Sequence, residues 1–251
     1  MKKFFNLVAL VAISLLFVQC GQNGSSQGQG KHPGHENVDS STPLETPILG
    51  LGKDKGHEYV DLGLPSGLKW ATCNVGATAP EEYGDYFAWG EVESKYYFSW
   101  TRYKYCAGSD KTLTKYCDDR SYSKDGFTDR NTVLDPEDDA ATANWGGAWR
   151  MPTKEEQDEL RNKCTWTWTT QNGVNGYKVT VPNGNSIFLP AAGYMSTTYS
   201  RENVGSYGYY WSSSLSIVNP SNAYNVYFLS DYVDWVNYGR SYGRSVRPVC
   251  Q

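Results

Sequence analysis

The sequence predicts an α+β domain in which antiparallel strands are accompanied by one or two helices. Short runs with apolar residues are separated by turn-forming residues such as Pro65, Ser66 and Gly67, which is the pattern of β-hairpins. A capping box, Thr153 followed three residues later by Glu156, marks one helix at residues 153–163. After that helix, the rest of the sequence has the pattern of strands and turns only.

The first part of the domain is expected to hold few regular elements. Residues 59–64 and 68–72 predict the two strands of a hairpin, and residues 86–89 predict one further strand. Residues 91–135 are polar, studded with aromatic side chains and without a clear period, so we expect an elaborate loop region there. Loop regions of this kind often carry function.

An acidic stretch at residues 135–141 predicts the start of a short helix, with Asp138 or Asp139 as its N-cap. A sharper interpretation is a calcium site, because hard cations bind clustered carboxylates. Its ligands would be Asp135, Glu137, Asp138 and Asp139. The stretch lacks the alternate spacing of a known calcium loop, and we expect neither a metal nor another cofactor.

The C-terminal part predicts a hairpin and three more strands. Residues 178–181 and 186–189 flank a strong turn signal, and strands follow at 224–229, 233–237 and 245–249. In the strands at 224–229 and 233–237, apolar and wetter residues alternate, so each strand has one face for the core. The residues expected in the core are Val226, Phe228, Val233 and Trp235, with Val246 buried by the closing strand.

The segment 193–249 has an unusual composition for a packed core, because it carries ten of the chain's 20 tyrosines interleaved with Ser, Asn, Asp and Gly. Tyrosine offers a large amphipathic contact area, and Ser, Gly and Asn supply adaptable hydrogen bonds, as in antibody-like binding sites. This mixture favours a recognition surface. The alternative is a tyrosine-rich antiparallel sheet without a ligand, since tyrosine is also a favoured strand residue.

The N-terminus predicts export and a lipid anchor. Lys2 and Lys3 precede an apolar run at residues 4–18 that is short for a membrane span, so residues 1–20 predict a signal peptide. The run ends at Cys20, the position expected to be acylated, although Gln19 departs from the usual small residue. Residues 21–55 predict a flexible tether, and residues 56–251 predict the folded domain. The alternative is a secreted protein without lipid.

The charge of the chain narrows the classes of partner, and its cysteine content allows disulfides. The chain has a net charge of −4, and removal of the two signal-peptide lysines makes it more acidic, which argues against nucleic acid as a partner. Five cysteines follow Cys20, in an exported chain where disulfides can persist. Of these, Cys106 and Cys117 are the nearest pair and the expected bridge.

Several catalytic classes are excluded by residue content. All three histidines, His32, His35 and His57, precede Glu58, so a Ser-His-Asp triad, a Cys-His pair and His-ligated zinc are unavailable in the domain proper. Carboxylate-pair hydrolysis remains open, but no spacing selects a pair. The acids considered are Asp118, Asp119, Asp125 and Asp129. We therefore expect a protein that is not an enzyme.

Several stretches of the sequence also resemble those of a known family. The matching stretches are EYVDLGLPSGLKWATCNVGA (58–77), YFAWGE (86–91), DDAATANWGGAWRMPTKEE (138–156), LPAAGY (189–194), YYWSSS (209–214) and GRSVRPV (243–249). In their order they resemble the major paralogous domain family of Fibrobacter succinogenes, which is abundant in Bacteroidetes lipoproteins. The resemblance covers residues 58–249 and implies a C-type-lectin-like fold.

The resemblance also carries implications for function. The formylglycine-generating enzymes share the fold, but their C-terminal redox cysteines are not matched here, since only Cys250 follows Cys164. The variable proteins of diversity-generating retroelements share it as well, and their ligand-binding faces have the composition found between Tyr207 and Tyr242. The resemblance thus implies an outer-membrane or cell-surface lipoprotein, with programmed diversification of this segment as one possibility.

The functional prediction is a surface that binds a protein or glycan ligand. Its alternatives are a structural or adhesion subunit of the envelope and, less favoured, a formylglycine-generating-like or carbohydrate-active enzyme. Residues that are not needed in the core, both in the strands and in the turns between them, are expected to face the ligand. They are Tyr207, Tyr224, Tyr227, Asp231, Tyr232, Asp234, Asn237, Tyr238, Ser241 and Tyr242, with Ser216 and Asn222 at the margin.

Overall fold

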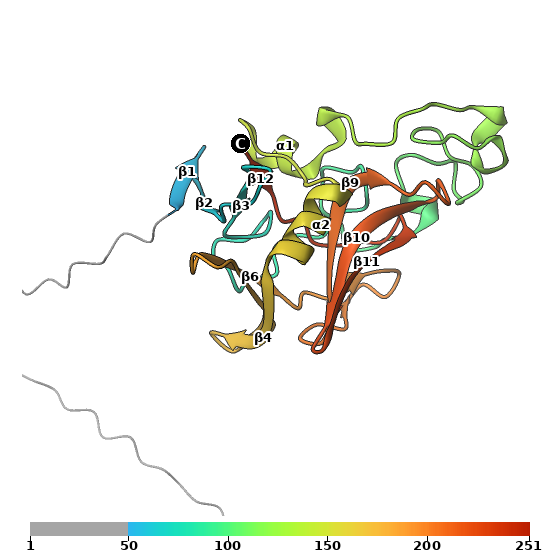
Figure 1. The fold of residues 1–251 in the computed structure, drawn as a ribbon. Helices are drawn as coiled ribbons and strands as arrows, with labels where there is room; N and C mark the ends of the chain where they lie inside the picture. The colour runs from blue at the N-terminus through green and yellow to red at the C-terminus, as the bar shows by residue number, and fades with distance from the viewer. Residues whose placement is uncertain (1–49) are drawn as a thin grey trace, which may run out of the picture. The chain divides into compact units, whose positions relative to one another are not determined.

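The computed structural model describes residues 50–251 (Figure 1). The predicted signal peptide at 1–20, the acylation site Cys20 and the predicted tether up to residue 49 lie outside the described residues. Within the described part, most regular structure is antiparallel sheet with two α-helices, which confirms the prediction of antiparallel strands with few helices. No helix among residues 50–251 is both long and apolar enough to cross a membrane.

The first sheet joins the two ends of the domain, in the order β1-β2-β3-β12. Its strands are β1 (Leu51–Asp54), β2 (His57–Asp61), β3 (Lys69–Ala71) and β12 (Val249–Cys250). The predicted first hairpin is confirmed by the antiparallel pairing of β2 with β3, and Val249 of β12 lies opposite Trp70. The closing strand is shorter than predicted, because Ser245 forms only an isolated bridge with Tyr210.

The predicted tether ends too late. Strand β1 pairs with β2 through a tight turn at Lys55 and Gly56, which both have positive φ angles, of 49° and 86°. Such angles favour glycine in the turn of a two-residue hairpin. The sequence of β1, LGKD, carries no strand-like alternation of apolar residues, so no strand was predicted there. The strand is defined instead by its backbone pairing with β2.

A second sheet has the order β4-β5-β6. Its strands are β4 (Thr165–Gln171), β5 (Val174–Thr180) and β6 (Ser186–Pro190). The hairpin β5-β6 confirms the predicted one, whereas β4 was not predicted. Asn172 and Gly173 form its turn to β5 with φ angles of 47° and 82°, the geometry for which an Asn-Gly pair is typical.

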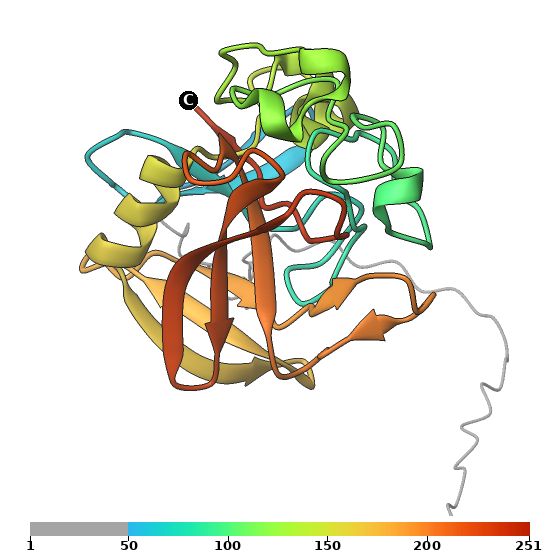
Figure 2. The same cartoon turned by 90° about the vertical axis from the view of Figure 1, so that its right-hand side faces the viewer.

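The third sheet, in the order β11-β10-β9, is built from the tyrosine-rich segment (Figure 2). Its strands are β9 (Gly208–Leu215), β10 (Asn222–Leu229) and β11 (Tyr232–Gly239), and the hairpin β7 (Tyr194–Met195) and β8 (Arg201–Glu202) lies beside it. The strands predicted at 224–229 and 233–237 are confirmed as β10 and β11. Strand β9 was not predicted, because all of its residues are buried and it lacks the alternating pattern.

In the sequence, the two helices follow the loop region and precede the strands of the second and third sheets. Helix α1 (Ala140–Trp145) is capped by Asp139, whose side chain accepts a hydrogen bond from the Thr142 amide. Helix α2 (Lys154–Lys163) has Thr153 as N-cap and the predicted capping box with Glu156. The predicted helix at 153–163 is thus confirmed.

The loop region predicted at 91–135 is confirmed, with four short 3-10 segments in and just after it. These are η1 (Trp100–Arg102), η2 (Arg120–Tyr122), η3 (Lys124–Gly126) and η4 (Pro136–Asp138). The strand predicted at 86–89 is wrong, because only Phe87 pairs, in a single bridge to Arg244. Cysteines 106 and 117 are both free, so the expected bridge between them is wrong. The Cys106 thiol instead donates to the Trp100 carbonyl at 3.0 Å.

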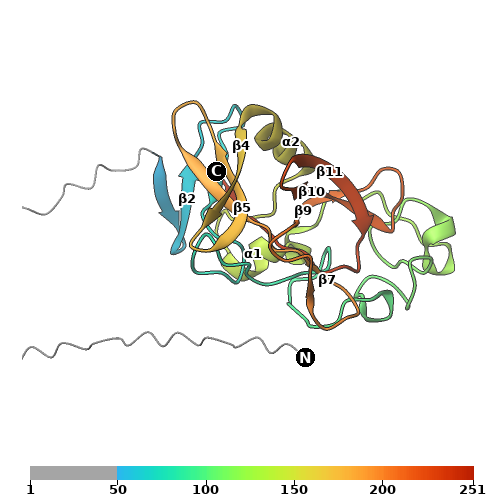
Figure 3. The same ribbon diagram turned by 90° about the horizontal axis from the view of Figure 1, so that it is seen from below.

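One apolar core lies where the three sheets and α2 meet (Figure 3). It includes Val60, Leu160, Val179, Val226 and Phe228, all nearly inaccessible to solvent. A second core lies under the long loops and includes Trp89, Trp211 and the buried Val246, as predicted for the closing segment. The third sheet therefore contributes to both cores, which fixes its two faces relative to the rest of the domain.

Candidate recognition surface

Strand register divides the third sheet into two faces. Tyr227 lies opposite both Tyr209 and Asp234, whereas Val226 lies opposite Tyr210 and Trp235. Residues directly opposite one another in an antiparallel pair share a face. The face of Val226 packs on the core shared with α2 and the other sheets, so we call it the core face. The face of Tyr227 carries most of the tyrosines.

Seven tyrosines form a continuous aromatic cluster centred on this second face. We call this cluster the tyrosine patch; it consists of Tyr194, Tyr207, Tyr209, Tyr227, Tyr232, Tyr238 and Tyr242. Tyr209 is at its centre, with its ring centroid 5.1 Å from that of Tyr227 and 5.4 Å from that of Tyr194. These separations are within the range of favourable aromatic pairs.

The remaining members extend the patch outward. The rings of Tyr207 and Tyr232 lie 5.9 and 6.1 Å from the Tyr227 ring. Tyr238 lies 6.4 Å from Tyr209, and Tyr242 lies 5.9 Å from Tyr194. Exposure increases from the centre to the edge: Tyr209 is buried, whereas Tyr232, Tyr238 and Tyr242 are 47%, 46% and 37% exposed. Three large amphipathic side chains are thus presented to solvent on a packed aromatic base.

The patch is a surface rather than a pocket. The four largest hollows described, with volumes between about 360 and 490 Å³, have no tyrosine-patch residue in their linings. The hollow of about 490 Å³ lies between the first two sheets and is lined by residues such as Val60 and Phe188. A broad aromatic surface of this kind suits a macromolecular ligand better than a small molecule, which usually binds in a concave site.

Burial and hydrogen bonding raise the phenol pKa values of four tyrosines in the patch. Burial, and then the hydrogen bond to Glu202, raise the pKa of Tyr194 to about 12. The pKa values of Tyr209 and Tyr227 are raised chiefly by burial, and that of Tyr232 by its hydrogen bond to Asp234. These phenols remain protonated near neutral pH, so each can both donate and accept hydrogen bonds.

Five predicted ligand-binding residues belong to the tyrosine patch: Tyr207, Tyr227, Tyr232, Tyr238 and Tyr242. Asp231 is exposed in the turn between β10 and β11, at the end of the sheet that carries Tyr232. The predicted set therefore contains the exposed part of the surface.

Three predicted members are not presented on the patch face. Tyr224 is buried on the core face, opposite Asn237, because strand alternation sets it out of phase with Tyr227. Asn237 accepts a hydrogen bond from the Asn222 side chain at 2.9 Å, and Ser241 is buried. For these three residues the prediction of a ligand-facing position is wrong.

Asp234 lies on the patch face, opposite Tyr227, and is part-exposed. Its carboxylate accepts a hydrogen bond from Arg161 of α2 at 2.8 Å and another from the Tyr232 hydroxyl at 3.0 Å. The side chain thus joins β11 to the helix and orients one patch tyrosine. Of the marginal residues, Ser216 is buried and its hydroxyl accepts from the Val218 amide. These polar residues hold the scaffold together.

The residues predicted to be in the core are buried on β10, whereas those on β11 are less buried than predicted. Val226 and Phe228 are fully buried, but Val233 and Trp235 are only half-buried because β11 is the edge strand. The Trp235 ring packs against Tyr224 at 5.3 Å, and the Lys154 ammonium lies 4.4 Å from its centroid. Trp235 therefore covers part of the core rather than filling it.

Three important residues were absent from the prediction. Tyr209 lies on β9, which was not predicted as a strand because all of its residues are buried. Tyr194 lies on β7, and only the folded structure brings it to Tyr209. Arg244 lies beneath the patch, with its guanidinium carbon 4.6 Å from the ring centroids of Tyr209 and Tyr238. An arginine in a glycine-rich turn gave no signal of such burial.

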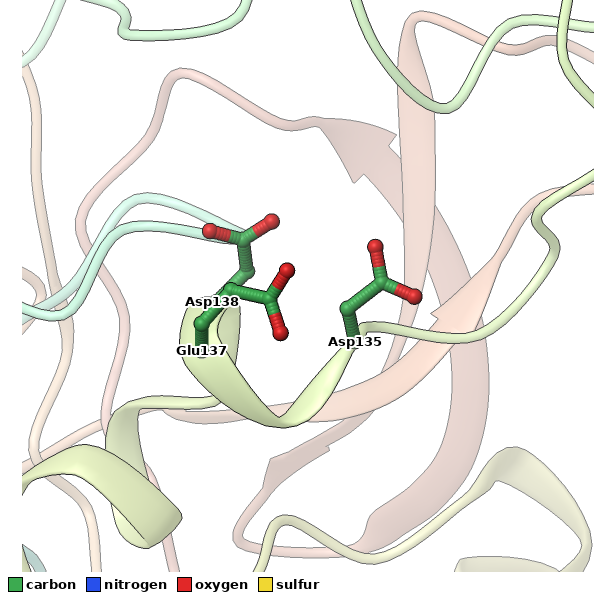
Figure 4. Close-up of side chains that lie close together, drawn as sticks. All are labelled: Asp135, Glu137 and Asp138. Atoms are coloured by element: carbon green, nitrogen blue, oxygen red, sulfur yellow. The ribbon is translucent and has the colours of Figure 1, made fainter.

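Three side chains of the acidic stretch, Asp135, Glu137 and Asp138, lie close together (Figure 4). Oxygens of Asp135, Glu137 and Asp138 lie within 4.8 Å of one another, but the Lys115 ammonium is 2.6 Å from the Asp135 and Asp138 carboxylates. Asp139 instead caps α1, so it is not the fourth ligand of the calcium interpretation. A lysine side chain supplies the positive charge for which a calcium ion was considered.

Asp138 is a structural acid. Burial opposes its ionisation, but hydrogen bonds from Lys115, Tyr105 and Tyr116 outweigh burial and lower the pKa of the carboxyl to about 2. Two of the acids considered for hydrolysis are likewise used in loop structure. Asp129 accepts from the Tyr116 and Cys117 amides, and Asp119 caps η2.

Comparisons with known proteins add one match. A family model described as a domain of unknown function, DUF8237, matches residues 158–249, which run from within α2 through the last sheet to the first residue of β12. No curated protein and no solved structure matches the chain. The matched range includes the whole tyrosine patch.

Proposed function

We propose that this chain is a cell-envelope lipoprotein that binds a macromolecular ligand, a protein or a glycan, through the tyrosine patch. The observation that carries the proposal is the exposure of Tyr232, Tyr238 and Tyr242 on a packed aromatic base. Aromatic anchors dominate binding energy at interfaces, and the packed base reduces the rotational freedom that these side chains lose on binding.

The proposal extends to fold and family. A C-type-lectin-like domain of the Fibrobacter major paralogous type agrees with the pairing of β12 with the N-terminal strands. It also agrees with the turn at Trp149 to Pro152 that leads directly into capped helix α2. In this proposal the domain is a non-catalytic scaffold that requires no cofactor.

Diversification by a retroelement is the finer part of the proposal. Its support is residue usage, because the stretch from Tyr207 to Tyr242, which carries six of the seven patch tyrosines, is rich in Tyr, Asn, Ser, Asp and Gly. The genomic neighbourhood tests it directly. A reverse transcriptase beside a near-copy of the 3′ end of the gene is expected, and a neighbourhood without either would overturn this part alone.

The principal alternative is an envelope subunit that buries the patch against a second copy. Sedimentation of the full chain over a hundredfold concentration range separates the two functions. A monomer throughout supports a surface left open for a ligand. A stable dimer that is lost on replacement of Tyr232, Tyr238 and Tyr242 by Ala would favour the structural function, since a specific homodimer buries such residues.

The ligand can be sought with arrays of purified extracellular proteins and glycans probed with the full chain. A ligand that binds the wild type and fails to bind the variant with all three exposed tyrosines replaced supports the proposal. A ligand that binds both equally would contradict it. The variant with Tyr96→Ala is the matched control, because Tyr96 is 81% exposed and lies outside the tyrosine patch.

A further inference from the structure

Arg244 is a buried cation without a carboxylate partner. Its side chain lies on the patch face of the third sheet, and the residue is only 2% exposed. Its guanidinium is 4.6 Å from each of the ring centroids of Tyr209, Trp211 and Tyr238. Nη1 donates to Oδ1 of Asn225, and Nε is buried without a hydrogen-bond partner. No ion pair of Arg244 occurs within residues 50–251.

The two neighbouring buried arginines are held differently. Arg247 donates to the carbonyls of Ala71, Thr72 and Phe188 and to the Asn74 side chain, which uses all three of its nitrogens. Arg240 donates to two backbone carbonyls under the long loops. Backbone carbonyls thus stabilise those two charges, whereas Arg244 depends on one amide oxygen and three aromatic faces. Its unpartnered Nε belongs to a guanidinium that lies beside two rings of the tyrosine patch, those of Tyr209 and Tyr238.

Access to Arg244 depends on an exposed side chain. Tyr238 lies on edge strand β11, is 46% exposed and places its ring beside the guanidinium. Exposed side chains change rotamer within nanoseconds, so rotation of Tyr238 uncovers the cation without any movement of the sheet. The phenols of Tyr209 and Tyr242 are also near the guanidinium and can donate hydrogen bonds to an anion bound there.

We propose that Arg244 is the anion-binding centre of the tyrosine patch and pairs with the carboxylate of an aspartate or glutamate side chain on a partner protein. This inference rests on the proposed function, because it names the chemistry recognised at the same surface. Guanidinium groups bind carboxylates through paired N–H donors, and the buried Nε and an adjacent Nη form such a pair. Tyr238 acts as the lid over the cation.

Local charge favours a single carboxylate over a polyanionic glycan. Asp231 and Asp234 lie at one end of the patch, Glu202 accepts a hydrogen bond from Tyr194, and the whole chain has a net charge of −4. These negative groups repel a chain of uronates or sulfates, whereas one acidic side chain that projects from a protein loop can reach Arg244 between the rings. The partner is therefore expected to be a protein with an acidic residue at the centre of its contact surface.

The test is a titration of the full chain, observed through the Arg244 Nε–H resonance, with glutamate capped as N-acetyl and N-methylamide. Capped glutamate is expected to shift this resonance saturably at millimolar concentration, and its capped glutamine analogue is expected to bind at least tenfold more weakly. Equal binding of the two would overturn the proposal. Tighter binding of glucuronate than of capped glutamate would assign the site to acidic sugars and would also overturn it.

Three variants make the result specific. Arg244→Lys should weaken capped-glutamate binding at least tenfold, because lysine lacks the paired donors. Tyr238→Ala should tighten it at least threefold by removing the lid, even where it weakens a macromolecular ligand. Arg240→Lys, a matched change at a buried arginine outside the patch, should leave it unchanged. If Arg244→Lys loses its folded state, Tyr238→Ala decides: no tightening contradicts the proposal.

Failure here is distinguishable from failure of the recognition function. If capped glutamate does not bind while the exposed-tyrosine variants still lose a macromolecular ligand, the patch is a recognition surface that does not use Arg244. If neither effect is observed, both proposals are wrong.

Discussion

At the scale of single residues, position within the third sheet decides which aromatic side chains hold the fold and which remain free to bind. Phe228 is fully buried in the core where the three sheets meet, and Gly208 opposite it leaves room for its ring, because a Cβ there would collide with the ring. Trp235 is larger but lies half-buried on the edge strand. By residue type alone, the larger tryptophan would be expected to bury more area and to contribute more to stability than the phenylalanine.

The first prediction follows from this difference in burial. Phe228→Ala should lower the free energy of unfolding by about 3 to 5 kcal/mol, since it removes a fully buried ring and leaves a cavity. Trp235→Ala should lower it by only about 1 to 2 kcal/mol, because part of its surface is already in contact with water. Urea unfolding of both variants checks the ranking, and a larger loss for Trp235→Ala would show that β11 is packed more deeply than described.

The second prediction concerns pH. The folded-state pKa of Asp138, about 2, lies below the ordinary aspartate value, so its ionised form stabilises the fold above about pH 4. That contribution is lost as the pH falls through about 2, where the folded protein also takes up the proton. Asp138→Asn should therefore cost about 1 to 2 kcal/mol at pH 6 and much less at pH 2. Unfolding measured at both values checks this, and a cost independent of pH would contradict it.

At the scale of elements, α2 is bonded to both outer strands of the third sheet. Its Arg161 binds Asp234 of β11, and its Gln157 donates to carbonyls of β9. The helix begins at Thr153, whose hydroxyl accepts from the Glu156 amide while Glu156 accepts from the Thr153 amide. The capping box therefore fixes the starting point of a helix that buttresses the recognition sheet.

The third prediction tests this start. Thr153→Ala should lower the free energy of unfolding by about 1 kcal/mol, the usual cost of losing an N-cap side chain. Thr167→Ala, at an exposed position of β4, is the control and should change it by less than about 0.5 kcal/mol. A cost that is equal for both would show that the cap contributes nothing beyond threonine itself.

Local signals accounted for part of the fold. The capped helix, the loop region and two of the three sheet-three strands follow from capping chemistry and strand alternation. Strand β4 was predictable, because Trp166 and Trp168 alternate with threonines before the Asn-Gly turn. Strand β9 was not, because a strand buried on both faces has no alternation to detect.

The candidate site was predicted less completely, for a physical reason. Composition and alternation identified the exposed tyrosines on β11 and in its turns. They assigned Tyr224 to the wrong face, because a phase error of one residue in a strand exchanges its faces. Contacts such as Tyr194 with Tyr209, or Arg244 beneath the rings, join distant segments and depend on tertiary packing that no local pattern records.

At the scale of the whole molecule, the proposed lipoprotein displays this domain from a membrane through an acylated Cys20. The fourth prediction is that a metabolic fatty-acid probe labels the wild type and fails to label Cys20→Ser. A single buried acyl chain anchors only marginally, so several chains are needed for stable attachment. Equal labelling of both proteins would exclude acylation at this cysteine, and loss of labelling only in a Cys164→Ser control would place it elsewhere.

The most direct test of the central claim is the dissociation constant of an identified ligand for single variants of the tyrosine patch. Replacement of Tyr232, Tyr238 or Tyr242 by Ala should weaken binding by about 2 kcal/mol or more for at least one of them, with stability changed by less than about 0.5 kcal/mol. Tyr96→Ala, at a more exposed position outside the patch, should leave binding unchanged. Binding unaffected by all three patch variants, or lost only when they unfold, would contradict recognition by this surface.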